Sequence, residues 1–82
     1  MRIKAKIIGM GERKSGTSKK GRAYDFTPFH LVYEDKNTEG FAVATANVDQ
    51  SILDPIPLPK VNDEIDLFCH FYNGSMTVDG IL

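Results

Sequence analysis

Apolar and polar residues alternate along much of this chain, and a period of two is typical of β-strands with one buried face. Near the N-terminus, Ile3, Ala5 and Ile7 alternate with basic residues at positions 2, 4 and 6. Similar alternation or short runs of β-branched and aromatic residues recur further on, whereas helical periodicity is hard to find. The predicted strands begin at position 2 and continue past Gly9 and Gly11, then cover about 22–33, 41–48, 65–71 and 76–82.

Glycine-containing and polar segments separate these strands. Gly9 and Gly11 predict a bulge or bend in the first strand, because glycine within a strand often marks one. Residues 15–18 with Gly21 predict a flexible loop, and residues 35–40 predict a polar turn. Asn73-Gly74 predicts a tight hairpin of type I′, in which both residues adopt positive φ.

Residues 50–59 have a different character. Pro55, Pro57 and Pro59 alternate with apolar residues, and proline lacks the amide donor that a central strand needs. We therefore predict an extended loop here. The apolar residues expected to hold it against the core are Ile52, Leu53, Ile56 and Leu58.

Five short antiparallel strands favour a barrel, because closure removes exposed strand edges. The predicted fold is all-β: a five-stranded antiparallel OB-fold barrel, the type that binds oligonucleotides, with an SH3-like barrel as the second choice. At 82 residues, positions 1–82 are expected to form a single domain with a thin core.

Composition places the chain among ordinary soluble globular proteins, with 41% apolar and 26% charged residues. No run approaches a membrane span, and the alternating N-terminus lacks the apolar block of a signal peptide. Cys69 is the single cysteine, so no internal disulfide is expected and a reducing, cytoplasmic location is predicted.

The formal net charge of −1 conceals a strong asymmetry. Residues 1–22 contain eight basic residues and one acidic residue, a net charge of +7, while residues 23–82 contain two basic and ten acidic residues, a net charge of −8. Such a chain can present one strongly positive face to a polyanion. The alternative is a solvated surface on which the fold mixes the two signs.

A cluster of cations is followed directly by two aromatic residues. If residues 22–33 form a strand, Arg22, Tyr24 and Phe26 share one face. Cations neutralise phosphates and flat rings stack on unpaired bases, which is the combination that binds single-stranded nucleic acid with little regard to sequence. The alternative is that both rings lie in the core. The basic residues of this candidate site are Arg13, Lys14, Lys19, Lys20 and Arg22.

Other chemistry finds no support in the sequence. The segment from Gly11 to Gly16 begins like a phosphate-binding P-loop, but Thr17 and Ser18 stand where that motif requires lysine and then serine or threonine. His30, Cys69 and His70 lack a fourth metal ligand at a usual spacing. No carboxylate pair or nucleophile with a base is evident, so neither an enzyme nor a cofactor is expected.

The chain from about Lys14 to Leu82 resembles the gene-five-type single-stranded DNA-binding proteins of filamentous bacteriophages. The most specific part of the resemblance is the Ser-Gly-x-Ser-basic-x-Gly-basic-x-Tyr pattern. The residues that carry it are Ser15-Gly16-Thr17-Ser18-Lys19-Lys20-Gly21-Arg22-Ala23-Tyr24, then Tyr33-Glu34-Asp35, and Gly74-Ser75-Met76 with Asp79.

The resemblance implies a five-stranded barrel, a two-fold homodimer and coating of single-stranded DNA during replication of a phage or related mobile element in a bacterial host cell. By position, the residues that match DNA-contacting residues of the family are Lys14, Lys19, Arg22, Tyr24, Phe26 and Tyr33, and Phe41 lies close to another exposed aromatic of the family. Two features depart from the family: basic residues beyond the last hairpin are missing, and Asn73 replaces an aromatic at the hairpin tip.

Two other functions remain open at this stage. One is an RNA-binding regulator on a cold-shock-like barrel, because nothing in the sequence reports on recognition of the 2′-hydroxyl. The other is a protein-interaction module that uses the acidic part of the chain or the proline-containing segment 55–59.

Overall fold

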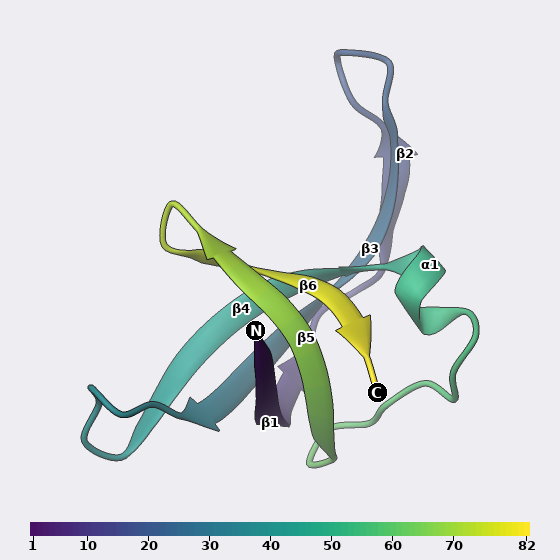
Figure 1. Ribbon diagram of the computed structural model, residues 1–82. Helices are drawn as coiled ribbons and strands as arrows, with labels where there is room; N and C mark the ends of the chain where they lie inside the picture. The colour runs from purple at the N-terminus through teal and green to yellow at the C-terminus, as the bar shows by residue number, and fades with distance from the viewer.

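The computed structural model describes residues 1–82 as six strands and one short helix (Figure 1). Every strand pairing is antiparallel. The elements in chain order are β1 (Arg2–Met10), β2 (Lys14–Thr17), β3 (Ala23–Glu34), β4 (Phe41–Asp49), α1 (Gln50–Leu53), β5 (Glu64–Tyr72) and β6 (Ser75–Ile81).

The long strand β3 organises the sheet. One of its edges pairs with β2 along its N-terminal part and with β1 along its C-terminal part, and the other edge pairs with β4. β1 then pairs with β5, and β5 with β6. The end strands β4 and β6 contact one another, but no hydrogen-bonded ladder joins them.

The predicted all-β, antiparallel architecture is confirmed, but the closed five-stranded barrel is not. The sheet is open and has six strands, because the chain breaks after Met10 and forms the separate strand β2 against the extended N-terminal part of β3. The register of β1 shifts between Ile7 and Gly9, so the predicted bulge is present.

Alternate residues of the strands form the core. Ile7 on β1 lies opposite Leu31 on β3, and Phe29 on β3 lies opposite Ala46 on β4, all with their side chains buried. The apolar alternation in the sequence therefore marks the inner face correctly. The buried apolar residues are Ala5, Ile7, Phe29, Leu31, Ala46, Val48, Leu53, Leu67, Cys69, Met76 and Val78.

Two tight connections match their sequence signals. Asn73 and Gly74 adopt φ values of 51° and 78°, as the predicted type I′ turn between β5 and β6 requires. Gly40 has a φ of 82° at the end of the polar turn between β3 and β4. Glycine adopts this conformation at little energetic cost because it has no Cβ atom.

The segment 50–59 is not wholly extended. Its first residues form α1, where the Asp49 carboxylate accepts a hydrogen bond from the Ser51 backbone amide and so caps the N-terminus of the helix. Leu53 is buried, as expected, but Leu58 is exposed and Pro59 is buried in its place. The helix is too short to produce a helical period in the sequence. It is also the one helix of the fold, and it is far too short to cross a membrane.

The buried thiol of Cys69 leads to a prediction about its reactivity. Burial raises the pKa of Cys69, so the thiolate that reacts with alkylating reagents is scarce near pH 8. We expect native protein to react with iodoacetamide at least tenfold more slowly than urea-unfolded protein. Equal rates, measured by mass spectrometry, would show that the thiol is accessible in the folded state.

Candidate nucleic-acid interface

β2 and the N-terminal part of β3 form an arm that projects away from the rest of the molecule (Figure 1). The connection between them is short. The Ser18 amide donates to the Arg22 carbonyl, the Gly21 amide donates to the Ser18 carbonyl, and Gly21 adopts a φ of 79°. The expected flexible loop is therefore limited to residues 18–22, since the residues from Lys14 to Thr17 belong to a strand.

Two aromatic rings lie side by side on the outer face of this arm. The ring centroids of Tyr24 and Phe26 are 5.8 Å apart, and the ring planes are inclined by 39°. Tyr24 is 42% exposed, Phe26 is half-buried, and neither belongs to the core cluster. Thr27 and Phe29 are buried instead, so the inner face of β3 is set by the odd-numbered residues from 27 onward. The alternative that places both rings in the core is not what the structure shows.

Gly16 makes room for the Tyr24 ring. The two residues are paired across the arm, and a Cβ atom at Gly16 would lie only 2.9 Å from Tyr24 Oη and 3.1 Å from Cζ. The φ of Gly16 is not positive. The glycine therefore allows the ring to lie across β2, which is a different role from the loop flexibility that the sequence suggested.

Four cations of the arm have no acidic partner. Lys14 lies opposite Phe26, so the two side chains share a face of the arm. Lys19 and Lys20 occupy the tip of the hairpin, and Arg22 follows it. All four side chains are exposed, and none forms an ion pair. The arm thus presents free positive charge next to flat apolar surface.

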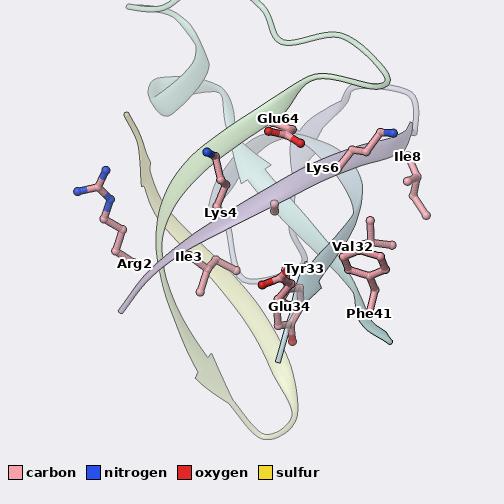
Figure 2. A pocket seen from close by; sticks show the side chains of 11 residues that line it. Arg2, Ile3, Lys4, Lys6, Ile8, Val32, Tyr33, Glu34, Phe41 and Glu64 are labelled. Carbon is pink, nitrogen blue, oxygen red and sulfur yellow. The ribbon is translucent and has the colours of Figure 1, made fainter. Parts of the chain in front are cut away.

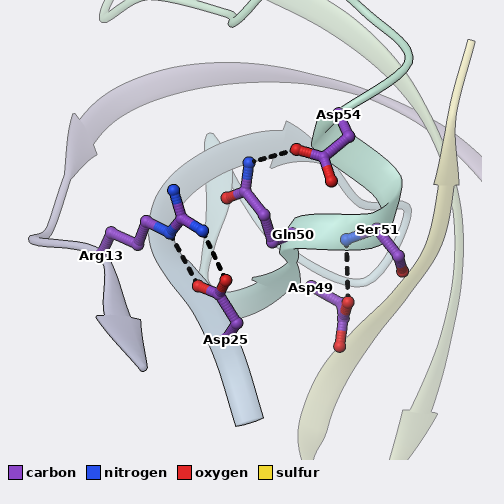
Figure 3. A network of polar contacts seen from close by, with 6 residues as sticks. All are labelled: Arg13, Asp25, Asp49, Gln50, Ser51 and Asp54. Carbon is purple, nitrogen blue, oxygen red and sulfur yellow. Dashed lines mark hydrogen bonds and ion pairs between the residues drawn. The ribbon is translucent and has the colours of Figure 1, made fainter. Parts of the chain in front are cut away.

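Arg13 differs from these cations because its charge is already compensated. Its guanidinium donates two hydrogen bonds to the Asp25 carboxylate, one from Nε at 2.7 Å and one from Nη2 (Figure 3). The paired arginine holds the pKa of Asp25 below its usual value, and the carboxylate raises the pKa of Arg13. The sequence analysis expected Arg13 to be available for binding phosphate, but in the structure its guanidinium is paired with Asp25.

The pairing of Arg13 leads to a test by substitution. Asp25→Asn removes the negative charge and releases the guanidinium, so we expect tighter binding of oligo-dT by about threefold to tenfold and a salt slope steeper by about 0.7. Glu39→Gln is the control, since Glu39 is exposed in the turn between β3 and β4 and pairs with no cation. An equal gain from both variants would show that only overall charge matters.

The pairing of Arg13 with Asp25 also makes the stability of the fold depend on pH. The folded-state pKa of Asp25 is depressed, so the pair stabilises the fold above the ordinary aspartate pKa of about 3.9, and this stabilisation is lost as the pH falls below it. At the neutral pH of a binding experiment, Arg13 is therefore fully paired.

Tyr33 and Phe41 lie at the opposite end of β3 from the arm. Tyr33 faces inward, 6.5 Å from the ring of Phe71, and burial is the main cause of its raised pKa. Phe41 is 64% exposed and lies opposite Glu34. Glu34 lies ten positions after Tyr24 along β3, a distance of roughly 30 Å. These two aromatics are therefore not part of the cluster on the arm.

A hollow lies beside Phe41 (Figure 2). Ile8, Val32 and Phe41 gather on one side of it, and the side chains of Lys4 and Lys6 from β1 border it. The sequence analysis did not include these lysines in the site. The alternation at the N-terminus could have found them, because it places the basic residues of β1 on the outer face.

No protein-family model, no curated protein and no solved structure matches this chain.

Proposed function

We propose that the protein binds single-stranded DNA with little sequence preference through the arm formed by β2 and β3. The observation that carries this proposal is the ring pair of exposed Tyr24 and half-buried Phe26 on an arm with four unpaired cations. The rings offer faces for unpaired bases, and the cations offer partners for phosphates. Stacking rings favour single-stranded over duplex nucleic acid, because they require the free faces of unpaired bases.

The strand pairing supports an oligonucleotide-binding barrel of the partly open kind. β1 is flanked by β3 and β5, β4 follows on the far edge of β3, and β6 follows on the far edge of β5. The two end strands approach one another, as in a five-stranded Greek-key barrel that is incompletely closed. In this proposal, β2 is an extension that builds the arm.

The biological setting is proposed from the sequence resemblance to gene-five-type proteins. It comprises a homodimer in the cytoplasm of a bacterial host that coats single-stranded DNA during replication of a phage or mobile element. Exposed apolar side chains such as Leu58 and Tyr72 offer surface for self-association. Sedimentation at micromolar concentration tests this part separately, and a mass near one chain would contradict it.

Titration of fluorescent oligo-dT at several salt concentrations tests the binding proposal. Four phosphate contacts, one for each unpaired cation of the arm, give an expected slope of log K against log salt near −3, from about −0.7 per contact. A flat salt dependence, or no binding at low salt, would contradict the proposal. Competition with oligo-U of the same length then separates a DNA-binding protein from the RNA-binding alternative.

A further inference from the structure

We propose that the nucleic-acid path continues beyond Phe26 along the outer face of β3, over Pro28 and His30, and that His30 is a further base-contacting residue. This inference rests on the proposed function and extends the same site. Nothing in the sequence patterns singled out these two residues for binding.

The rings of Tyr24, Pro28 and His30 on this face each lie over a glycine of β1, of β2 or of the segment between these strands. A Cβ atom at Gly11 would lie 2.9 Å from Cγ of Pro28, and a Cβ atom at Gly9 would lie 3.3 Å from Cδ2 of His30. The same arrangement places Gly16 against Tyr24. Gly16, Gly11 and Gly9 carry no side chain that would occupy the surface beside β3. The three rings therefore pack directly against the backbone of these glycines.

The spacing of these residues suits an extended strand of nucleic acid. Alternate residues of a β-strand point to the same face and are about 6.7 Å apart, so the row from Tyr24 to His30 is roughly 20 Å long. That separation is close to the distance between successive bases in an extended, unstacked chain. The row therefore offers positions for about four nucleotides, at the lower end of the site sizes of oligonucleotide-binding barrels.

The His30 ring is held in place while remaining exposed. Its Nδ1 atom lies 3.1 Å from Thr45 Oγ1 on β4, so the threonine hydroxyl fixes the orientation of the ring. No hydrogen bond engages Nε2. The ring thus offers a flat face for stacking and a polar nitrogen for a base edge.

The path also connects the two groups of candidate residues. The next outer-face residue of β3 after His30 is Val32, which lies opposite Lys6 on β1. Val32 and Lys6 line the hollow beside Phe41 (Figure 2). Positive charge is therefore present at both ends of the row, from Lys14 at the arm and from Lys6 at the hollow, which complements a polyanion lying along it.

The test compares His30→Ala with His70→Ala. His70 is the matched control because it is the other histidine of the chain, is also exposed, and lies on β5, where its Nδ1 is 2.8 Å from Asp79 Oδ2. For an oligo-dT of about twelve nucleotides, we expect His30→Ala to lose about fivefold or more in affinity, the lower end of the cost of losing one stacked base. We expect His70→Ala to bind like the wild type.

A measurement on the unmodified protein accompanies the variants. The ring C2–H proton of His30 is expected to shift in the NMR spectrum when oligo-dT is added, whereas that of His70 stays in place. If the wild type binds and Tyr24→Ala weakens binding, but His30 neither shifts nor matters on substitution, this inference is wrong while the proposed function stands. If the wild type does not bind oligo-dT, the proposed function fails and this inference fails with it.

Discussion

Replacing Tyr24 and Phe26 together by alanine is expected to weaken binding of oligo-dT about thirtyfold or more while leaving the protein folded. Stacking contributes about 1–3 kcal/mol for each base, so the loss of two rings removes at least this much affinity. The loss should be similar for all base sequences, because every base offers a face for stacking. Fluorescence anisotropy with oligo-dT and a mixed-sequence oligonucleotide measures both effects.

The fold should tolerate this double change because neither ring belongs to the core cluster. Phe68→Ala is the matched control: Phe68 is 44% exposed, close to the 42% of Tyr24, but it lies on β5 away from the arm. We expect Phe68→Ala to retain binding. An unfolded double variant, seen by circular dichroism, would show that the rings are structural, and unchanged affinity would show that they do not contact nucleic acid.

Phe29→Ala is expected to cause the largest loss of stability. Phe29 is fully buried between Met10 on β1 and Ala46 on β4, where a truncated side chain leaves a cavity. Such changes lower the free energy of unfolding by about 3–5 kcal/mol, a large part of the 5–15 kcal/mol that typically stabilises a domain. We expect the urea midpoint to fall sharply and part of the protein to be unfolded in buffer.

Val43→Ala provides the comparison for this loss of stability. Val43 is an exposed residue of β4, so its truncation removes no core contact, and we expect a change in unfolding free energy within about 0.5 kcal/mol. Equal urea midpoints for the two variants would mean that the inner and outer faces of the sheet have been assigned wrongly.

Most of the strands could be predicted because their signals are local. The alternation around Ile7 identified β1 and its inner face, and Asn73-Gly74 identified the last hairpin through its need for positive φ. β2 gave no such signal. Its four exposed residues contain neither alternation nor a β-branched run, and they are extended because the partner strand β3 pairs with them.

The openness of the sheet could not be read from the sequence either. Whether β4 and β6 join depends on the twist and length of every strand between them, which no local pattern encodes. The short helix α1 was missed for a different reason: four residues are too few for a helical period, although Asp49 at its start is a recognisable cap.

Part of the candidate site could be predicted from strand parity, which means that alternate residues of a strand point to the same face. Parity placed Tyr24 and Phe26 together on one face, and the structure shows this arrangement. It could not reveal that Asp25 compensates Arg13, because that ion pair depends on the path of the chain between β1 and β2. The resemblance, not the strand pattern, grouped Phe41 with the arm, and the continuous strand β3 places Phe41 at the far end from Tyr24.

Intrinsic tyrosine fluorescence reports directly on whether the Tyr24 ring stacks on bases. The chain has three tyrosines and no tryptophan, and Tyr24 is the one that lies on the arm. If its ring stacks on bases, adding oligo-dT at low salt quenches part of the tyrosine emission, the quenching saturates, and added salt reverses it. Emission that stays constant with excess oligo-dT at low salt would contradict the account.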